Sequence, residues 1–159
     1  MHGDDSVLFR RYVKGRRKAI FPWSLSIVDC FFISGALTSL AGSVPSRMLR
    51  ISDEGNQVEE VDVSDSYDMY EVDTGADGAE VVLLHQASGS ACYWDIHERF
   101  VVVTGAENFL EKVRPYPDDI ERHRYVEAML GMERAGNGES PEEVYEALSA
   151  DDCSAENES

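Results

Sequence analysis

The stretch Glu80–Thr104, EVVLLHQASGSACYWDIHERFVVVT, carries the strongest structural signal in this chain. Two apolar runs, Glu80–Gln86 and Ala91–His97, flank a short Ser/Gly loop, which is the pattern of a β-hairpin. A third run, Phe100–Thr104, follows a turn around Glu98 and predicts a return strand. Pairing across the loop places six side chains on one face, which we expect to be core: Val81, Leu83, His85, Cys92, Trp94 and Ile96.

Upstream of this stretch, the sequence predicts more strands. Arg47–Ile51 has the composition of a short strand, and Val58–Val63 alternates apolar and acidic residues, as a half-buried strand does. Met69–Val72 is a candidate for the same pattern. These strands place acids on a solvent-facing side of the sheet (Glu60, Asp62 and Glu71) and on the connection (Asp65 and Asp68).

Downstream, three helices are expected. Thr104–Glu107 has the Ser/Thr-x-x-Glu form of a capping box and precedes Phe109, Leu110 and Val113 at helical spacing. A second helix follows the PYPDD break, over Ile120–Met132.

Ser140–Glu143 starts the third helix, with Pro141 at its first position. The final residues, DDCSAENES, have the composition of a disordered tail. Strands followed by helices predict an α+β fold, mainly an antiparallel sheet with the C-terminal helices packed on one face. We expect residues 1–18 to form a basic arm or first helix, 19–134 a single α+β domain, and 135–159 a short helix and acidic disordered tail.

The apolar segment Ala19–Gly42 follows a basic run, as a signal peptide or a membrane helix would. Pro22 and Asp29 interrupt it, and a charge inside a membrane helix costs about 3 kcal/mol. The favoured interpretation is therefore a buried strand and helix. The core residues expected from this segment are Leu25, Ile27, Val28, Phe31, Phe32, Ile33 and Leu37.

The chain is strongly acidic, with a formal net charge of -17 over 159 residues. Residues 1–50 hold 8 basic and 3 acidic residues, whereas residues 51–159 hold 6 basic and 28 acidic ones. Because binding to phosphates needs a basic surface, this charge argues against direct nucleic-acid binding and favours a basic protein partner.

The run Asp53–Glu80 contains eleven acids and no Lys or Arg. Such a run is typical of a solvated loop or a disordered arm, and the alternative is a recognition surface. On the second interpretation, eight residues are candidates for partner binding: Glu59, Glu60, Asp62, Asp65, Asp68, Glu71, Asp73 and Asp77.

Enzyme and metal sites are the minority interpretations. Asp73–Asp77, DTGAD, resembles the catalytic loop of retroviral-type aspartic proteases, which would make Asp73 the catalytic aspartate. The acids lack the order of an EF-hand loop, and His85, His97 and Cys92 do not complete a tetrahedral metal site. The three cysteines lack CxxC spacing and indicate a reducing compartment. We expect no catalytic residue, no metal and no cofactor.

The order of elements from Glu80 to Val113, ending in AENFLEKV, resembles the later half of SUKH-superfamily immunity proteins. The resemblance implies direct binding and neutralisation of a bacterial toxin, often a nuclease.

Together these features predict a cytoplasmic binding inhibitor of a basic protein, most simply a toxin-neutralising immunity protein, with no membrane association. Complementary charge would speed capture of such a partner. Two alternatives remain open: an acidic mimic of nucleic acid, and the aspartic protease.

Overall fold

The three apolar runs of residues 80–104 form three neighbouring strands, as predicted. The computed structural model describes residues 6–42, 45–131 and 139–158. In it, β4 (Val81–His85), β5 (Ser90–Trp94) and β6 (Val101–Thr104) pair antiparallel in chain order. The hairpin register opposes Val81 to Trp94 and Leu83 to Cys92, and all four side chains are buried.

Ile96 was predicted to share the buried face of the hairpin, and this was wrong. It lies in the turn after β5 and is half exposed.

Three more strands complete one six-stranded antiparallel sheet in the order β1-β6-β5-β4-β2-β3. They are β1 (Lys18–Phe21), β2 (Ser46–Ser52) and β3 (Gln57–Val63), and the last two confirm the strands predicted upstream. A 3-10 turn, η1 (Asp53–Gly55), joins β2 to β3. β1 and β3 are therefore the two edges of the sheet.

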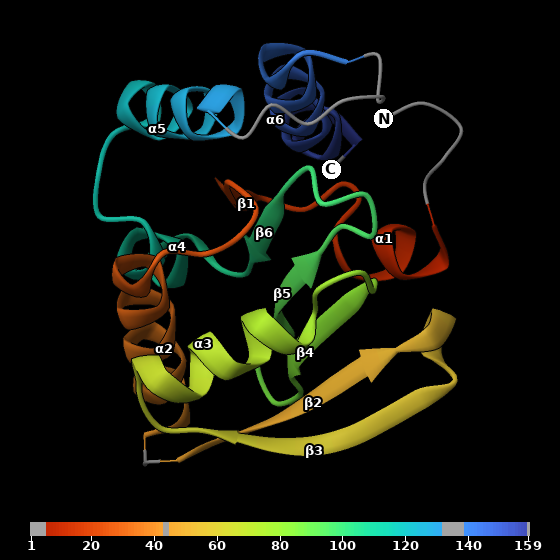
Figure 1. Cartoon of the computed structure of the whole chain (residues 1–159), viewed down its shortest axis with the longest axis vertical. Helices are drawn as coiled ribbons and strands as arrows, with labels where there is room; N and C mark the ends of the chain where they lie inside the picture. The colour runs from red at the N-terminus through yellow and green to blue at the C-terminus, as the bar shows by residue number, and fades with distance from the viewer. Residues whose placement is uncertain (1–5, 43–44, 132–138, 159) are drawn as a thin grey trace.

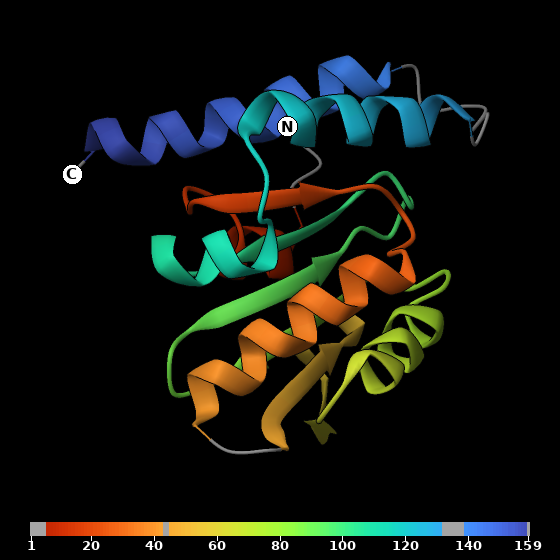
Figure 2. The same ribbon diagram turned by 90° about the vertical axis from the view of Figure 1, so that its left-hand side faces the viewer.

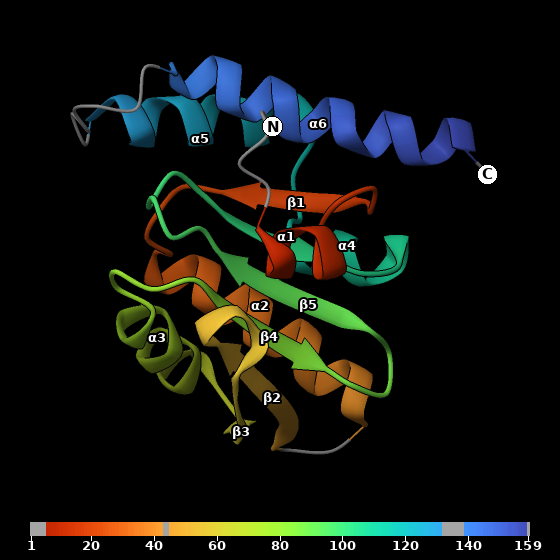
Figure 3. The ribbon, with the colours of Figure 1, turned by 90° about the vertical axis from the view of Figure 1, so that its right-hand side faces the viewer.

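Over the residues that the structure describes, six helices surround this sheet, and the fold is α+β as predicted (Figure 1). Their bounds are α1 (Val7–Tyr12), α2 (Ile27–Ala41), α3 (Ser66–Gly75), α4 (Glu107–Val113), α5 (Asp118–Gly131) and α6 (Pro141–Glu158). α2, α3 and α4 pack on one face, and the C-terminal pair α5 and α6 packs above the β1 end (Figures 2 and 3).

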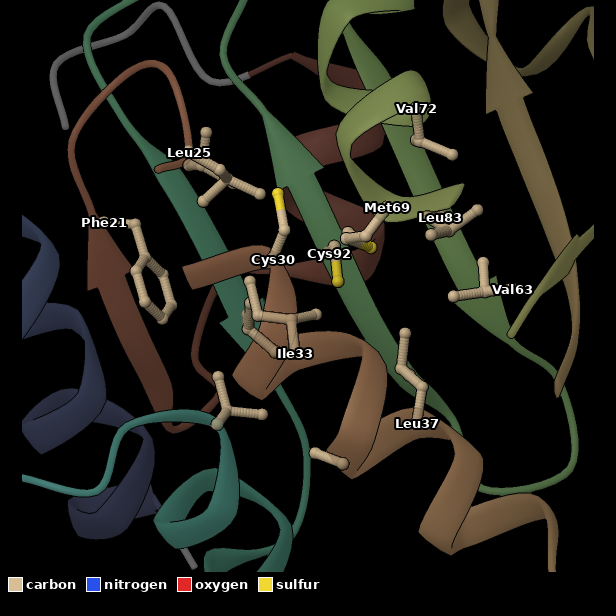
Figure 4. Packing of buried hydrophobic residues seen from close by; sticks show 14 of the residues in the cluster. Phe21, Leu25, Cys30, Ile33, Leu37, Val63, Met69, Val72, Leu83 and Cys92 are labelled. Atoms are coloured by element: carbon tan, nitrogen blue, oxygen red, sulfur yellow. The ribbon is translucent and has the colours of Figure 1, made fainter. Parts of the chain in front are cut away.

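Each face of the sheet has its own core. The first cluster lies under α2, α3 and α4 and contains Trp94, Ile33, Leu37 and Met69 (Figure 4). The second lies under α1, α5 and α6 and is rich in aromatic rings, among them Tyr93, Phe100, Tyr125 and Tyr145. Residues of α6 are thus part of the main fold.

The segment 19–42 forms β1 and α2, as predicted, but the expected core residues are only partly right. Leu25, Ile33 and Leu37 are buried, whereas Ile27, Val28 and Phe31 are 58%, 53% and 64% exposed, and Phe32 is half-buried. A helix that is apolar on every side gives no sequence signal for which side faces the core. The interrupting Asp29 completes a capping box with Ser26.

Three other expectations are corrected. Met69–Val72 belongs to α3 and is not a strand. α4 forms as predicted, but no side chain caps it: its N-cap is Ala106, while the Thr104 hydroxyl donates to the carbonyls of Tyr12 and Ala91. The predicted tail continues α6 as far as Glu158, so it is helical to that residue.

No helix in the part of the chain that the structure describes combines the length and the apolar composition required to cross a bilayer.

Candidate functional site

The acidic segment, residues 59–77, is folded over two elements instead of forming a loop. Glu59, Glu60 and Asp62 lie on β3, which is exposed along most of its length. Among the strands of the described segments, β3 pairs only with β2. Asp65 and Asp68 lie at the start of α3, Glu71 lies on its surface, Asp73 is buried within it and Asp77 follows its end. The predicted candidates therefore belong to two neighbouring elements, β3 and α3.

Two of these acids are paired within the molecule. Arg50 Nη1 contacts Glu59 Oε1 at 3.0 Å, and Arg47 Nε lies 3.6 Å from Asp62 Oδ1. Both arginines come from β2, directly opposite their partners in the strand register. Cross-strand pairs of this kind reduce the charge that Glu59 and Asp62 present to a partner.

Two more acids have a structural role at the start of α3. Asp65 is the N-cap, and its Oδ1 accepts from the Asp68 amide at 3.0 Å. Asp68 Oδ2 in turn accepts from the amide of Ser64 at 2.8 Å. An acid that satisfies amides at a helix start stabilises the helix, by roughly 0.5–2 kcal/mol for a cap. Both residues were predicted to lie on a connection. Asp65 does precede α3, whereas Asp68 lies within its first turn.

Asp73 was a candidate for the exposed binding surface, but only 2% of this residue is exposed. Its Oδ1 accepts from Trp94 Nε1 at 2.9 Å and from the Leu25 amide at 3.2 Å. Burial raises the pKa of this carboxyl, and the two hydrogen bonds oppose that rise. Asp73 therefore joins α3 to β5 and to the start of α2.

Glu60, Glu71 and Asp77 are the acids best placed to meet a partner. All three are exposed, and no hydrogen bond or ion pair joins their side chains to any residue that the structure describes. Their charges are therefore not reduced by an internal pair.

Sequence analysis missed the apolar part of this surface. α2 and α3 pack side by side (Figure 2). Each of the two helices also carries large side chains that are exposed. We define the α2–α3 face by these exposed residues together with one acid: Ile27, Val28, Phe31, Tyr67, Tyr70 and Glu71. The available signal was helical spacing, since Tyr67, Tyr70 and Thr74 lie opposite the buried Met69, Val72 and Ala76.

A cavity of about 280 Å³, the α3 cavity, adjoins this face. It lies between α3 and the segment before α2, and its lining includes Trp23, Tyr70, Asp73, Thr74, Asp77 and Glu98. The cavity therefore brings together residues from three separate parts of the chain.

A larger groove of about 830 Å³ lies between α4 and the C-terminal helices. Several of its charged groups pair with one another: Arg114 contacts Asp118 and Glu121, and Tyr145 donates to Glu121. Because the buried Glu121 and the arginine beside it already have partners, the groove is a weaker candidate for a charged ligand than the acidic segment.

The DTGAD segment differs from a protease loop in its backbone. Asp73 lies in the last turns of α3, and Thr74 donates to the carbonyl of Tyr70, four residues earlier in the helix. The nearby Cys30 thiol has its pKa raised to about 12, first by burial and then by Asp73 and Asp29, so it is protonated at neutral pH.

Comparisons with protein-family models, with curated proteins and with solved structures find no match for this chain.

Proposed function

We propose that the protein is a binding inhibitor that captures a basic protein partner through the α2–α3 face and the adjoining acid Asp77. The observation that carries this proposal is that exposed apolar and aromatic side chains lie beside acids without internal partners. Protein interfaces combine an apolar, aromatic centre with a polar rim.

The apolar part supplies the affinity in this proposal. Phe31 and Tyr67 are 64% and 65% exposed. Leaving such rings in water forgoes roughly 1.5–3 kcal/mol each, which burial against a partner would recover. Exposed apolar patches of this kind often mark protein-binding sites.

The acids supply speed and selectivity. With a net charge of -17, the chain attracts basic proteins and repels acidic ones at long range. Glu71 and Asp77 would then meet basic groups at the rim, where charge changes act mainly on the association rate.

The partner that we propose is a bacterial toxin, such as a nuclease. A nuclease carries a basic cleft for its substrate, and an acidic protein seated on that cleft blocks it. The resemblance of residues 80–113 to SUKH-superfamily immunity proteins points to the same activity. A nucleic-acid mimic is less well supported, because it needs a row of carboxylates that keep their charge. Glu60 and Asp62 lie two residues apart on the same side of β3, but Asp62 already pairs with Arg47.

The test begins with capture of the partner by the tagged chain, followed by purification of both proteins. The partner's own activity is assayed against increasing amounts of the chain, and we expect inhibition that is complete at equimolar ratio. A captured partner whose activity is unchanged would show that the chain is not its inhibitor.

Charge reversal then tests the surface. The double variant Glu71→Lys and Asp77→Lys should slow association by at least about tenfold at low salt and flatten its salt dependence. Glu111→Lys with Glu127→Lys is the matched control, since these exposed acids lie on α4 and α5. Equal slowing by both pairs would indicate net charge alone and would remove this face from the interface.

The apolar contribution is tested separately. Phe31→Ser should leave the midpoint of thermal unfolding within about 2–4 °C of wild type, because Phe31 is exposed, and should increase the dissociation rate. Unchanged dissociation would show that α2 lies outside the interface.

A further inference from the structure

The α3 cavity contains one buried polar atom without a partner and one carboxylate oxygen without a donor. Trp23 is 5% exposed, and among the residues that the structure describes its Nε1 has no acceptor. Both donors to Asp73 go to Oδ1, which leaves Oδ2 without a donor from the same residues. Buried polar atoms are rarely left unsatisfied, so Trp23 Nε1 suggests a ligand that supplies an acceptor, and Asp73 Oδ2 can accept from a donor of that ligand.

The walls of the cavity fit a cation. Trp23 and Tyr70 contribute aromatic rings, which attract a positive group placed over their faces. Asp73, Asp77 and Glu98 contribute carboxylates, and no Lys or Arg is among the lining residues. An acidic and aromatic lining of this kind disfavours anions and offers an uncharged ligand little advantage over water.

The aromatic and acidic lining favours a guanidinium over an ammonium. A guanidinium is planar, stacks on aromatic rings and presents five donors, so it can bond two carboxylates at once. The main-chain carbonyl beside such a side chain would provide an acceptor for Trp23 Nε1.

We infer that the α3 cavity binds the guanidinium of an arginine side chain that the basic partner presents. Asp73 Oδ2 and Asp77 accept its hydrogen bonds, and Trp23 and Tyr70 flank its plane. This inference rests on the proposed function, because it assigns one anchor residue within that interface.

The cavity can be tested without the partner. The probe is N-acetyl-arginine methylamide, titrated into ¹⁵N-labelled protein while the two indole N–H signals are followed by NMR. The chain has two tryptophans, and Trp23→Phe assigns the signals. We expect the Trp23 signal to shift in a saturable way. The citrulline analogue has nearly the same shape but no charge, and the Kd from its titration should be at least about tenfold higher.

The lysine analogue is the second comparison, and it should also bind more weakly than the arginine probe. A lysine probe that binds as tightly would overturn the assignment of a guanidinium. Absence of a saturable shift with the arginine probe would overturn the inference altogether.

Variants tie the binding to named residues. Asp77→Asn should weaken the arginine probe about tenfold, since it removes one charged acceptor. Glu60→Gln is the control, because it removes the same charge from an exposed position on β3. If both variants weaken the probe equally, the binding is non-specific attraction to an acidic protein, and the inference is wrong.

The two proposals can fail independently. Inhibition of a captured partner with no binding of the arginine probe would reject the cavity and keep the inhibitor. A saturable arginine site in a protein that inhibits no partner would reject the inhibitor and keep the cavity.

Discussion

Asp73 carries its carboxyl in a position almost closed to water, so its ionisation is coupled to folding. Burial raises its pKa in the folded chain above the ordinary value of 3.8, while the hydrogen bonds from Trp94 and Leu25 act in the opposite direction. Between the ordinary and the raised pKa, the folded state holds more protons than the unfolded chain does. Stability from this residue is therefore lost as the pH rises through that interval.

Asp73→Asn should remove this pH dependence. We expect the free energy of unfolding of the variant, minus that of wild type, to increase with pH by at most about 1.4 kcal/mol per pH unit. Urea unfolding of both proteins from about pH 4 to about pH 7 measures the difference. Glu121, whose pKa is also raised by burial, contributes to both proteins and cancels. A difference that is constant with pH would show that Asp73 ionises as an exposed carboxyl does.

At the scale of elements, the contact between α4 and the sheet depends on the absence of a side chain at Gly105. A Cβ there would lie 2.6 Å from Phe109 Cδ2 and 2.8 Å from Ser90 Oγ. Phe109 is buried in the first core cluster and has little freedom to move. Glycine at position 105 therefore permits the close approach of α4 to β6, and a larger residue there would not fit without movement.

Gly105→Ala should destabilise the protein by about 1–3 kcal/mol through overpacking. Gly35→Ala is the matched control: it lies in α2 with no atom within 4 Å of the new Cβ, and alanine there should stabilise by about 0.5–1 kcal/mol. Urea unfolding midpoints with unchanged m-values would report both effects. Equal stability of the Gly105 variant and wild type would contradict the close approach of α4.

The elements differ in how well the sequence predicted them. The strands of residues 80–104 and Val58–Val63 were predictable because apolar and β-branched runs alternate with clear turns. α3 was not, because Met69–Val72 is too short to distinguish a period of two from a helix. The Asp65-x-x-Asp68 spacing, an N-cap with its third-position partner, was the signal that could have identified it.

At the scale of the whole molecule, α6 belongs to the fold and is not an appendage. Val144, Tyr145 and Leu148 are buried in the second core cluster, and Asp151 contacts Lys18 Nζ at 3.1 Å and the Gly15 amide. Each buried side chain contributes about 1.5–3 kcal/mol, a large fraction of a typical domain's total.

The sequence predicted a domain that ends at residue 134. Because that domain would lack α6, a chain that ends at residue 134 should lose cooperative unfolding. Circular dichroism during heating measures this. A chain that ends at Asp151 is the control and should keep nearly the wild-type midpoint, because it retains the buried part of α6 and the contact with Lys18. A 1–134 chain that melts cooperatively at the wild-type midpoint would show α6 to be dispensable.

The candidate site was less predictable than the fold. The sequence identified the acids, but pairing with Arg47 and Arg50 and the burial of Asp73 depend on tertiary contacts. The α3 cavity joins Trp23 to Asp73 and Glu98, which lie 50 and 75 residues further along the chain. No local pattern connects positions so far apart.

The open edge of β3 has a consequence for how copies of the chain treat one another. β3 pairs with β2 on one side only, so its outer edge of seven residues is a template on which a second copy could add its own strand. Here Glu59, Glu60 and Asp62 lie along that edge, so two molecules approaching edge to edge bring like charges together. The carboxylates whose charge we propose to attract a basic partner thus also disfavour polymerisation of the chain through this edge, because they repel one another. Replacing these three acids with neutral residues would weaken that repulsion.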